Sequence, residues 1–245
     1  ASNIVGLTGM AREHEIFRQL DLKKDDTLLD VGCASGHQVF RAATICKKAV
    51  GIDIGDEFID TALAVQKEQG VANVEFLRVG GDTVPFPNET FDKLICSEVL
   101  EHVDDHHVFL DEIKRVVKKG GTLVLTVPNW NNRGTFYKRL KNGFRDFPFT
   151  PITDFSMEGI KAHGDAHVRQ FTIHTFADFV GSHGLRVVYV GGAAFIDGPK
   201  IGPVISIVNR LAFMRSLTFA FERLCGSIPF LRCLGRHVVL KAQKI

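Results

Sequence analysis

Short apolar runs alternate with helix-like segments through the first half of the chain, and no other feature constrains the fold as strongly. The runs have the length and apolar content of buried parallel strands. They lie at residues 26–31, 48–54, 74–79, 91–96 and 122–127. Strands that alternate with helices form a parallel sheet covered by helices on both faces. The sequence therefore predicts a doubly wound α/β core.

Helix-like segments fill the gaps between these runs. Helices are expected over residues 10–20 and 36–47. Asp56 is expected to cap a third helix, with Phe58 and Leu63 among the residues on its buried face.

A fourth helix is expected to begin at a second capping aspartate, either Asp104 or Asp105. It is expected to end in the basic, glycine-containing segment 118–121. Lysines are favourable in the last turn of a helix, and glycine commonly stops one.

The alternation breaks after Pro128. Regular structure is expected to resume later, with one helix and two strands. These lie at residues 175–183, 185–190 and 236–242. A chain of 245 residues that is 45% hydrophobic can bury a substantial core. We expect a single domain over residues 1–245.

A glycine-rich turn follows the first strand, with the pattern Asp30-x-Gly32-x-x-x-Gly36. Glycines let the backbone approach a ligand closely and turn into a helix whose N-terminus favours anionic groups. The spacing differs from the Gly-x-Gly-x-x-Gly pattern of dinucleotide-binding turns. Taken alone, the turn is also consistent with a purely structural strand-to-helix connection.

Acidic residues follow the second and third strands. Asp53 lies about 20 residues after the glycine turn, where a carboxylate can accept hydrogen bonds from both ribose hydroxyls. Asp82 suits the exocyclic amine of an adenine, while Val84 or Ile54 packs on its ring. The alternatives are a helix-capping acid and a surface turn. Ligands of doubly wound sheets bind at the carboxyl ends of the strands, so one shared cleft is expected.

The segment after the fourth strand lies where the reacting end of such a ligand should sit. Glu98, Glu101 and His102 are spaced to share one face of a helical turn, and such a face could hold a divalent metal ion.

Four features in this order resemble the class I S-adenosylmethionine-dependent methyltransferases of the type 11 group. The residues that carry the resemblance are LLDVGCASG (28–36), GIDI (51–54), GGDTVPFPNETFDKLICSEVLEHV (80–103) and EIKRVVKKGGTLVLTVPN (112–129). The resemblance covers about residues 25–130, the expected cofactor-binding core, and extends weakly to 167–188. It implies a Rossmann-like, mostly parallel sheet of seven strands in the order 3-2-1-4-5-7-6, with strand 7 antiparallel.

The resemblance also implies S-adenosylmethionine as the cofactor. The implied binding residues are Asp30, Gly32, Cys33, Gly36, Asp53, Ile54, Asp82, Thr83 and Ser97. The turn lines the methionine part, Asp82 and Thr83 take the adenine, and Ser97 lies near the sulfonium. The family often has a glycine where Ala34 stands. Ubiquinone-pathway O-methyltransferases carry a cluster similar to the acidic one above, which implies a metal site, although similar sequences occur in the group without metal.

Methyl transfer to an oxygen of a small or lipid-linked acceptor, by in-line displacement, is the expected function. A general base is needed only for a hydroxyl or a protonated nitrogen. The candidate catalytic bases are His102, His163 and His167, and each is equally consistent with a surface or structural imidazole. The alternative functions are a non-catalytic cofactor-binding interaction module and a nicotinamide-dependent oxidoreductase.

Two irregular insertions, 129–170 and 191–235, are expected to form an apolar lid on the cofactor side. Residues 200–245 hold eight basic residues and one acidic residue, a local charge of +7 against +2 for the whole chain. That balance favours peripheral contact of 200–235 with an anionic membrane, or else a solvated helical subdomain. It does not indicate a nucleic-acid partner.

The five cysteines show no paired spacing. They are expected to be reduced thiols, which favours a cytoplasmic location.

Overall fold

A computed structural model describes residues 7–80, 83–129, 171–194, 220–221, 224–225, 228 and 235–245. The helices are α1 (Leu7–Leu20), α2 (His37–Ala43), α3 (Asp56–Gln69), α4 (His106–Val116) and α7 (Ile173–Ser182). The strands are β1 (Thr27–Val31), β2 (Lys48–Asp53), β3 (Val74–Arg78), β4 (Phe91–Ser97), β5 (Val117–Pro128), β6 (Leu185–Ala193) and β7 (His237–Lys244). The expected insertions lie almost wholly outside the described residues.

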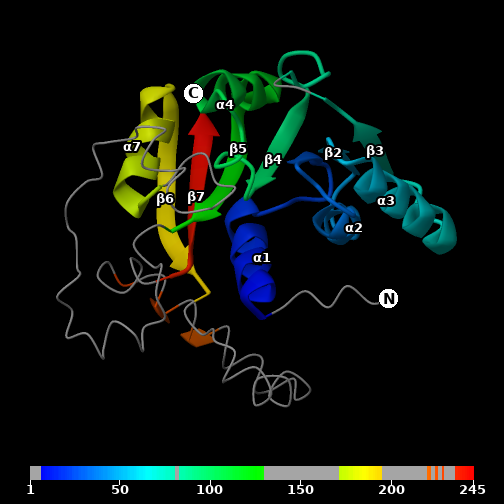
Figure 1. The fold of residues 1–245 in the computed structure, drawn as a ribbon, viewed down its shortest axis with the longest axis horizontal. Coiled ribbons are helices and arrows are strands. Elements are labelled where there is room, and N and C mark those ends of the chain that lie inside the picture. The colour runs from blue at the N-terminus through cyan, green and yellow to red at the C-terminus, as the bar shows by residue number, and fades with distance from the viewer. Residues whose placement is uncertain are drawn as a thin grey trace.

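These strands form one seven-stranded sheet in the order β3-β2-β1-β4-β5-β7-β6, which confirms the expected topology (Figure 1). The first five strands pair in parallel, whereas β7 is antiparallel to both of its neighbours, β5 and β6. The start of β7 therefore lies beside the carboxyl end of β5, where His237 pairs with Pro128. This edge of the sheet carries the candidate site.

Helices cover both faces of the sheet. One buried cluster joins the sheet to α4 and α7 and includes Leu29, whereas the other joins it to α1, α2 and α3 and includes Leu28. Neighbouring residues of a strand point to opposite faces, so β1 contributes to both clusters. Complete burial of a leucine stabilises the fold by about 1.5–3 kcal/mol, so this double burial fixes the strand register.

The start of α3 differs from the expectation. Gly55 occupies the N-cap position, and no side chain caps the helix. The Asp56 carboxylate instead forms an ion pair with Arg78 on β3, with 2.5 Å between Oδ1 and Nη1. The predicted cap at Asp56 is therefore wrong.

The buried face of α3 is also narrower than predicted. Ile59 and Ala62 are buried, whereas Phe58 and Leu63 are exposed. The helix packs on β2 and on the edge strand β3. Only a narrow stripe of the helix, formed by Ile59 and Ala62, is therefore covered.

The capping of α4 follows the prediction, because Asp105 Oδ1 accepts hydrogen bonds from the backbone N–H groups of His107 and Val108, both at 3.0 Å. The predicted helix end at 118–121 is wrong, since the helix ends at Val116 and β5 begins at the next residue. Lys118 reaches across to Asp92 of β4 at 2.7 Å, a contact that local propensity does not reveal.

Candidate functional site

The glycine turn adopts a backbone conformation that side chains rarely allow. Gly32 and Gly36 have φ angles of 75° and 83°. A Cβ atom on Gly32 would clash with Val99, and one on Gly36 would lie 2.5 Å from the ring of Phe76. Both glycines are thus required for packing against the loop after β4 and against β3, in addition to any approach by a ligand.

Asp53 ties this turn to the next helix. Its Oδ2 accepts a hydrogen bond from the backbone N–H of Ala34 at 2.8 Å, and its Oδ1 accepts one from Gly55 at 2.9 Å. Each carboxylate oxygen retains a second lone pair that can accept a ribose hydroxyl. Asp53 can therefore bind the ribose, as predicted, and also hold the start of α3, a role that was predicted for Asp56.

Asp30 lies on β1, two residues before the turn. It is 0% exposed, and neither carboxylate oxygen has a hydrogen-bond partner among the described residues. Burial, and then the charges of Asp53 and Glu13, hold the pKa of Asp30 well above its usual range. An unpaired buried carboxyl is costly. The ammonium group of the methionine part of S-adenosylmethionine would supply both donors and charge, so the residues fit that cofactor.

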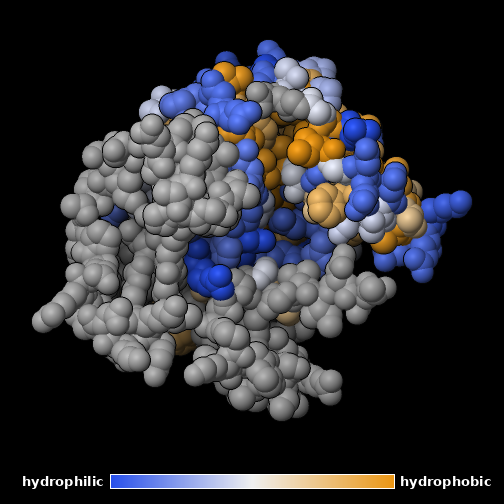
Figure 2. Space-filling view, viewed as in Figure 1, coloured by the Kyte–Doolittle hydropathy of each residue, from blue (hydrophilic) through white to orange (hydrophobic). Residues whose placement is uncertain are grey.

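The adenine side offers an exposed apolar surface next to Asp53. Ile54 is 73% exposed and Phe58 is 51% exposed, which is unusual for large apolar side chains. Figure 2 shows hydrophobic and hydrophilic side chains side by side on the viewed face of the molecule. Val84 is buried in the core, so of the two proposed ring contacts only Ile54 is available. Thr83 is exposed, and Asp82 lies outside the described residues.

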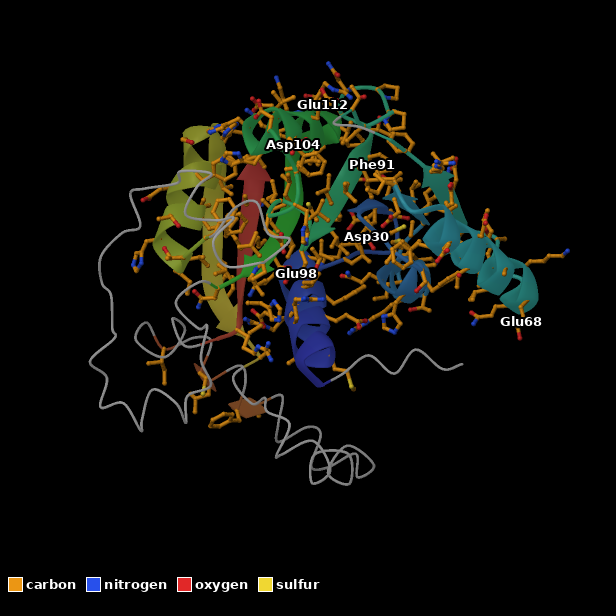
Figure 3. The ribbon with its side chains drawn as sticks, in the orientation of Figure 1. Asp30, Glu68, Phe91, Glu98, Asp104 and Glu112 are labelled. Carbon is orange, nitrogen blue, oxygen red and sulfur yellow. The ribbon has the colours of Figure 1, made fainter. Side chains whose placement is uncertain are left out.

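Strand β4 ends with Ser97, whose hydroxyl is hydrogen-bonded to Thr126 of β5 at 2.9 Å. Next to it, Glu98 has a left-handed backbone with φ of 59°. Its Oε1 accepts a hydrogen bond from Thr126 at 2.9 Å, and its Oε2 lies 2.9 Å from His237 Nδ1 and 3.3 Å from Arg12 Nη1. Figure 3 shows Asp30 and Glu98 close to α1.

The charge on Glu98 is stabilised by these neighbours. Burial alone raises the pKa of a carboxyl, but the hydrogen bond and charge of His237, then Arg12 and the Thr126 hydroxyl, lower the pKa of Glu98 below its usual value. Glu98 is therefore an anion that links β4, β5, β7 and α1.

Glu101 behaves in the opposite way. It is 1% exposed, and its carboxyl oxygens have no hydrogen-bond partner in the described part of the chain. Burial, and then the charge of Glu98, raise the pKa of Glu101 to about 8, so it is largely protonated at neutral pH. The side chain of His102 is 46% exposed, with Nε2 3.9 Å from Glu101 Oε1.

The predicted metal-binding set is thus divided among three environments. Glu98 faces His237, Glu101 is enclosed in the core, and His102 lies near the surface. Among the residues that the structure describes, no three His, Cys, Asp or Glu side chains are grouped so as to hold a metal ion. The described residues therefore do not support the metal site.

Two residues of this site were missed by the sequence analysis, namely Arg12 on α1 and His237 at the start of β7. Next to Arg12, Glu13 forms ion pairs with Arg41 and His37 of α2, at 2.7 and 3.2 Å. The sequence held one signal for His237. The last strand was predicted to be antiparallel, and such a strand starts at the edge of the sheet where the parallel strands end.

The two remaining predicted bases, His163 and His167, lie outside the described residues. Cys33 is buried, and burial raises the pKa of its thiol, so it lines the turn as a small neutral side chain.

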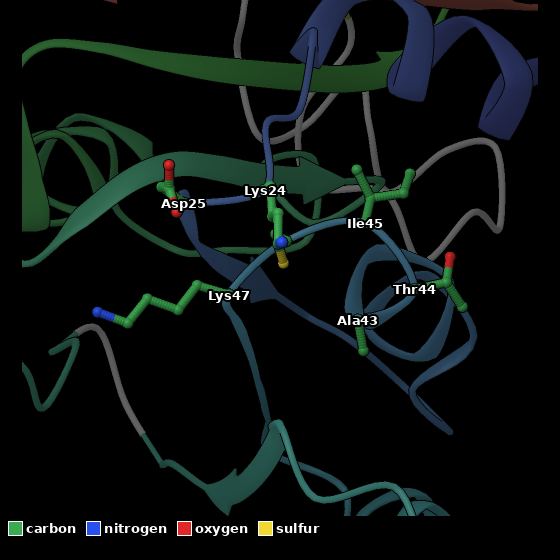
Figure 4. Close-up of a pocket in the computed structure, with 7 residues that line it drawn as sticks. Lys24, Asp25, Ala43, Thr44, Ile45 and Lys47 are labelled. Carbon is green, nitrogen blue, oxygen red and sulfur yellow. The ribbon is translucent and has the colours of Figure 1, made fainter.

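A pocket at the opposite edge is unrelated to this site (Figure 4). It is lined by Lys24 and Asp25 before β1, and by residues 43–47 between α2 and β2. These segments lie at the amino ends of the parallel strands, whereas ligands of such sheets bind at the carboxyl ends.

Known proteins similar to the chain point to one family. The family model described as a methyltransferase domain matches residues 29–125. The uncharacterised protein MJ1252 of Methanocaldococcus jannaschii is 31% identical over 197 residues, which are 76% of this chain and 72% of that protein.

Two further relatives match over shorter stretches. The uncharacterised methyltransferase YcgJ of Bacillus subtilis is 26% identical over 110 residues, which are 45% of this chain and 44% of YcgJ. A demethylmenaquinone methyltransferase of Lactococcus lactis is 29% identical over 121 residues, which are 46% of this chain and 48% of that enzyme. The aligned part of the chain thus spans less than half the length of either relative.

The solved structure of YcgJ shares the fold of this chain. The TM-score is 0.60 at 16% identity, over 95% of this chain and 97% of YcgJ. The strand order, the glycine turn and the sequence matches agree, and the chain belongs to the class I S-adenosylmethionine-dependent methyltransferases.

Proposed function

We propose that this chain transfers the methyl group of S-adenosylmethionine to the hydroxyl oxygen of a small or lipid-linked acceptor by in-line displacement. The observation that supports the donor site most directly is Asp30, a fully buried carboxyl with no hydrogen-bond partner among the described residues, beneath a turn held by Asp53. The sulfonium supplies a methyl carbon with a good leaving group. The chain's own residues bind and align the two reactants, which provides much of the acceleration.

A hydroxyl acceptor is favoured by the residues beyond the sulfonium end. His237 is held by an anionic Glu98 at the carboxyl edge of β5. A hydroxyl must lose its proton as its oxygen is methylated, and an imidazole at this edge is suited to take that proton.

The proposal is tested first by isothermal titration with S-adenosylhomocysteine and then by product analysis. We expect saturable binding, and failure to bind at millimolar concentration would refute the donor site. Incubation with isotopically methyl-labelled S-adenosylmethionine and extracts of the source cells should yield a labelled methyl ether. A labelled amine or a carbon-linked methyl group would refute the hydroxyl assignment while leaving the family intact.

A lipid-linked acceptor is favoured by an apolar stripe in the basic part of the chain. Phe221, Leu224 and Ile228 are all exposed, and their spacing places them on one side of a helical turn. One relative is named for the acceptor demethylmenaquinone. No helix within the described ranges is long and apolar enough to cross a membrane.

Co-sedimentation with liposomes tests this membrane contact. Binding is expected to increase with anionic lipid and to decrease with salt, because surface charges are screened over about 10 Å at 0.1 M salt. The double change Phe221→Ser and Leu224→Ser should weaken binding, while the matched change Phe58→Ser on α3 should not. An absence of binding at every salt concentration would refute membrane docking.

A further inference from the structure

We propose that His237 is the general base for the acceptor, with Nε2 taking the hydroxyl proton while Glu98 orients the ring and stabilises its charged form. This inference rests on the proposed function, namely transfer to a hydroxyl. It assigns the base to a residue that none of the sequence candidates included.

The position of His237 is fixed by the sheet. It begins β7, where it pairs in register with Pro128 of β5 and with Ala193 of β6. Its neighbour across the edge is Glu98, the residue directly after β4. Adjacent strands lie about 4.8 Å apart, so the start of β7 is about 10 Å from the end of β4. The two side chains bridge this distance and meet above the end of β5.

The contacts also connect His237 to the cofactor turn. Val99, one residue after Glu98, packs so closely on Gly32 that no side chain fits there. The loop after β4 therefore touches the donor side through Val99 and the imidazole through Glu98. Glu98 keeps a left-handed backbone that costs a non-glycine residue about 1 kcal/mol or more, and the surrounding structure sustains that conformation.

The tautomer follows from the donors and acceptors around the ring. Nδ1 lies 2.9 Å from Glu98 Oε2 and 3.5 Å from Arg12 Nη1. A guanidinium can only donate, and an ionised carboxylate can only accept, so the shorter contact makes Nδ1 the protonated nitrogen. The lone pair is then on Nε2, the atom able to receive a proton.

Two opposite charges lie next to the imidazole ring. Glu98 is anionic and favours the imidazolium, whereas the Arg12 guanidinium, which lies close to both Glu98 and the ring, opposes it. Glu101 lies behind Glu98 and is largely neutral at neutral pH, so it adds little negative charge. Glu98 is thus in place as the counter-ion of the imidazolium that forms when Nε2 accepts the proton.

The step balances without a further reactant. The acceptor oxygen attacks the methyl carbon and forms the new C–O bond, while the C–S bond breaks and leaves its electron pair on sulfur. The hydroxyl proton passes to His237 Nε2 and later leaves to solvent. Glu98 does not accept the proton but acts as a positioning residue, holding the ring through Nδ1.

The first test reads the tautomer and needs no acceptor. Nitrogen NMR of ¹⁵N-histidine-labelled protein, with S-adenosylhomocysteine bound, should show His237 protonated at Nδ1 in its neutral form. The change Glu98→Gln should weaken this preference for Nδ1, because an amide oxygen is a poorer acceptor than a carboxylate. A neutral ring protonated at Nε2, or a tautomer ratio unaffected by Glu98→Gln, would overturn the proposal.

The second test is the variant His237→Asn, whose amide can still donate to Glu98 in place of Nδ1 but has no group equivalent to Nε2. In assays with the acceptor identified from the labelled product, kcat should fall 10²- to 10⁴-fold. The residual rate should rise with hydroxide concentration. Affinity for S-adenosylhomocysteine should stay within twofold. The matched variant His174→Asn, at an exposed position of α7, should keep wild-type kinetics.

The outcomes separate this inference from the proposed function. Retention of kcat within threefold in His237→Asn, or loss of S-adenosylhomocysteine binding in that variant, would refute the base assignment alone. Absence of S-adenosylhomocysteine binding by the wild-type protein would instead refute the donor site of the proposed function.

Discussion

Individual residues of this site carry conformations and charges that only their surroundings explain. Ala34 has φ of 44°, a left-handed value, and its N–H group is held by Asp53. Glycine, which the family often has at this position, adopts such a φ angle without strain. Glu101 shows the same dependence for charge, because burial raises its pKa and keeps the carboxyl largely uncharged at neutral pH.

The change Ala34→Gly should relieve backbone strain in the turn. We expect the free energy of unfolding to rise by up to about 1 kcal/mol, which corresponds to about 2–4 °C in Tm for a chain of this size. Thermal denaturation measures the shift. Gly36→Ala is the opposing control, because its Cβ would press on Phe76, and its Tm should fall. A lower Tm for Ala34→Gly would contradict the strain argument.

Glu101 should make the fold less stable as pH rises. Its pKa of about 8 in the folded state exceeds the usual carboxyl value, so between about pH 5 and 8 only the folded state holds this proton. The Glu101 contribution to the free energy of unfolding should fall by about 1.4 kcal/mol per pH unit in that window. Urea denaturation of wild-type protein and Glu101→Gln, at pH 5 and at pH 8, isolates this contribution. Parallel pH dependences of the two proteins would contradict it.

At the scale of elements, tertiary contacts decided where helices begin and end. The sequence pattern predicted a long α4 with a basic last turn, but pairing of Val117 with Phe91 starts β5 immediately after Val116. Likewise, a hydrogen bond from the backbone N–H of Gly55 to the Asp53 carboxylate holds the start of α3 in place of the expected cap at Asp56. Local periodicity identifies the type of an element, whereas its ends depend on partners distant in the sequence.

Asp53 should therefore be important for two elements at once. In Asp53→Asn one oxygen becomes an amide NH₂, which cannot accept a hydrogen bond from both Ala34 and Gly55. We expect affinity for S-adenosylhomocysteine to fall at least tenfold, about 1.4 kcal/mol. Isothermal titration measures the change. Asp56→Asn, which removes only a surface ion pair with Arg78, should bind as the wild type does. Equal affinities for both variants would refute the bridging role.

At the scale of the whole molecule, the strand order was predictable from the sequence because the alternating pattern and the family resemblance agreed. The donor side was predictable for the same reason, since Gly32 directly follows β1 and Asp53 is the last residue of β2. The acceptor side was not, because Arg12, Glu98 and His237 come from three distant parts of the chain. Their meeting depends on which strand pairs with β5, a property that no local pattern encodes.

Cofactor binding should stabilise the entire domain. Free S-adenosylhomocysteine at 100 times its Kd should add about 2.7 kcal/mol to the free energy of unfolding, because it binds only the folded state. A thermal shift assay should show this increase, and NAD at the same concentration should not produce it. Stabilisation by NAD in the absence of any response to S-adenosylhomocysteine would overturn the cofactor assignment.

Helix α1 carries two neighbouring residues of opposite charge that contact different parts of the site. Arg12 forms an ion pair with Glu98 after β4, and Glu13 forms one with Arg41 on α2. A displacement of α1 would therefore strain both ion pairs. The helix thus couples the loop after β4 to the helix that follows the glycine turn.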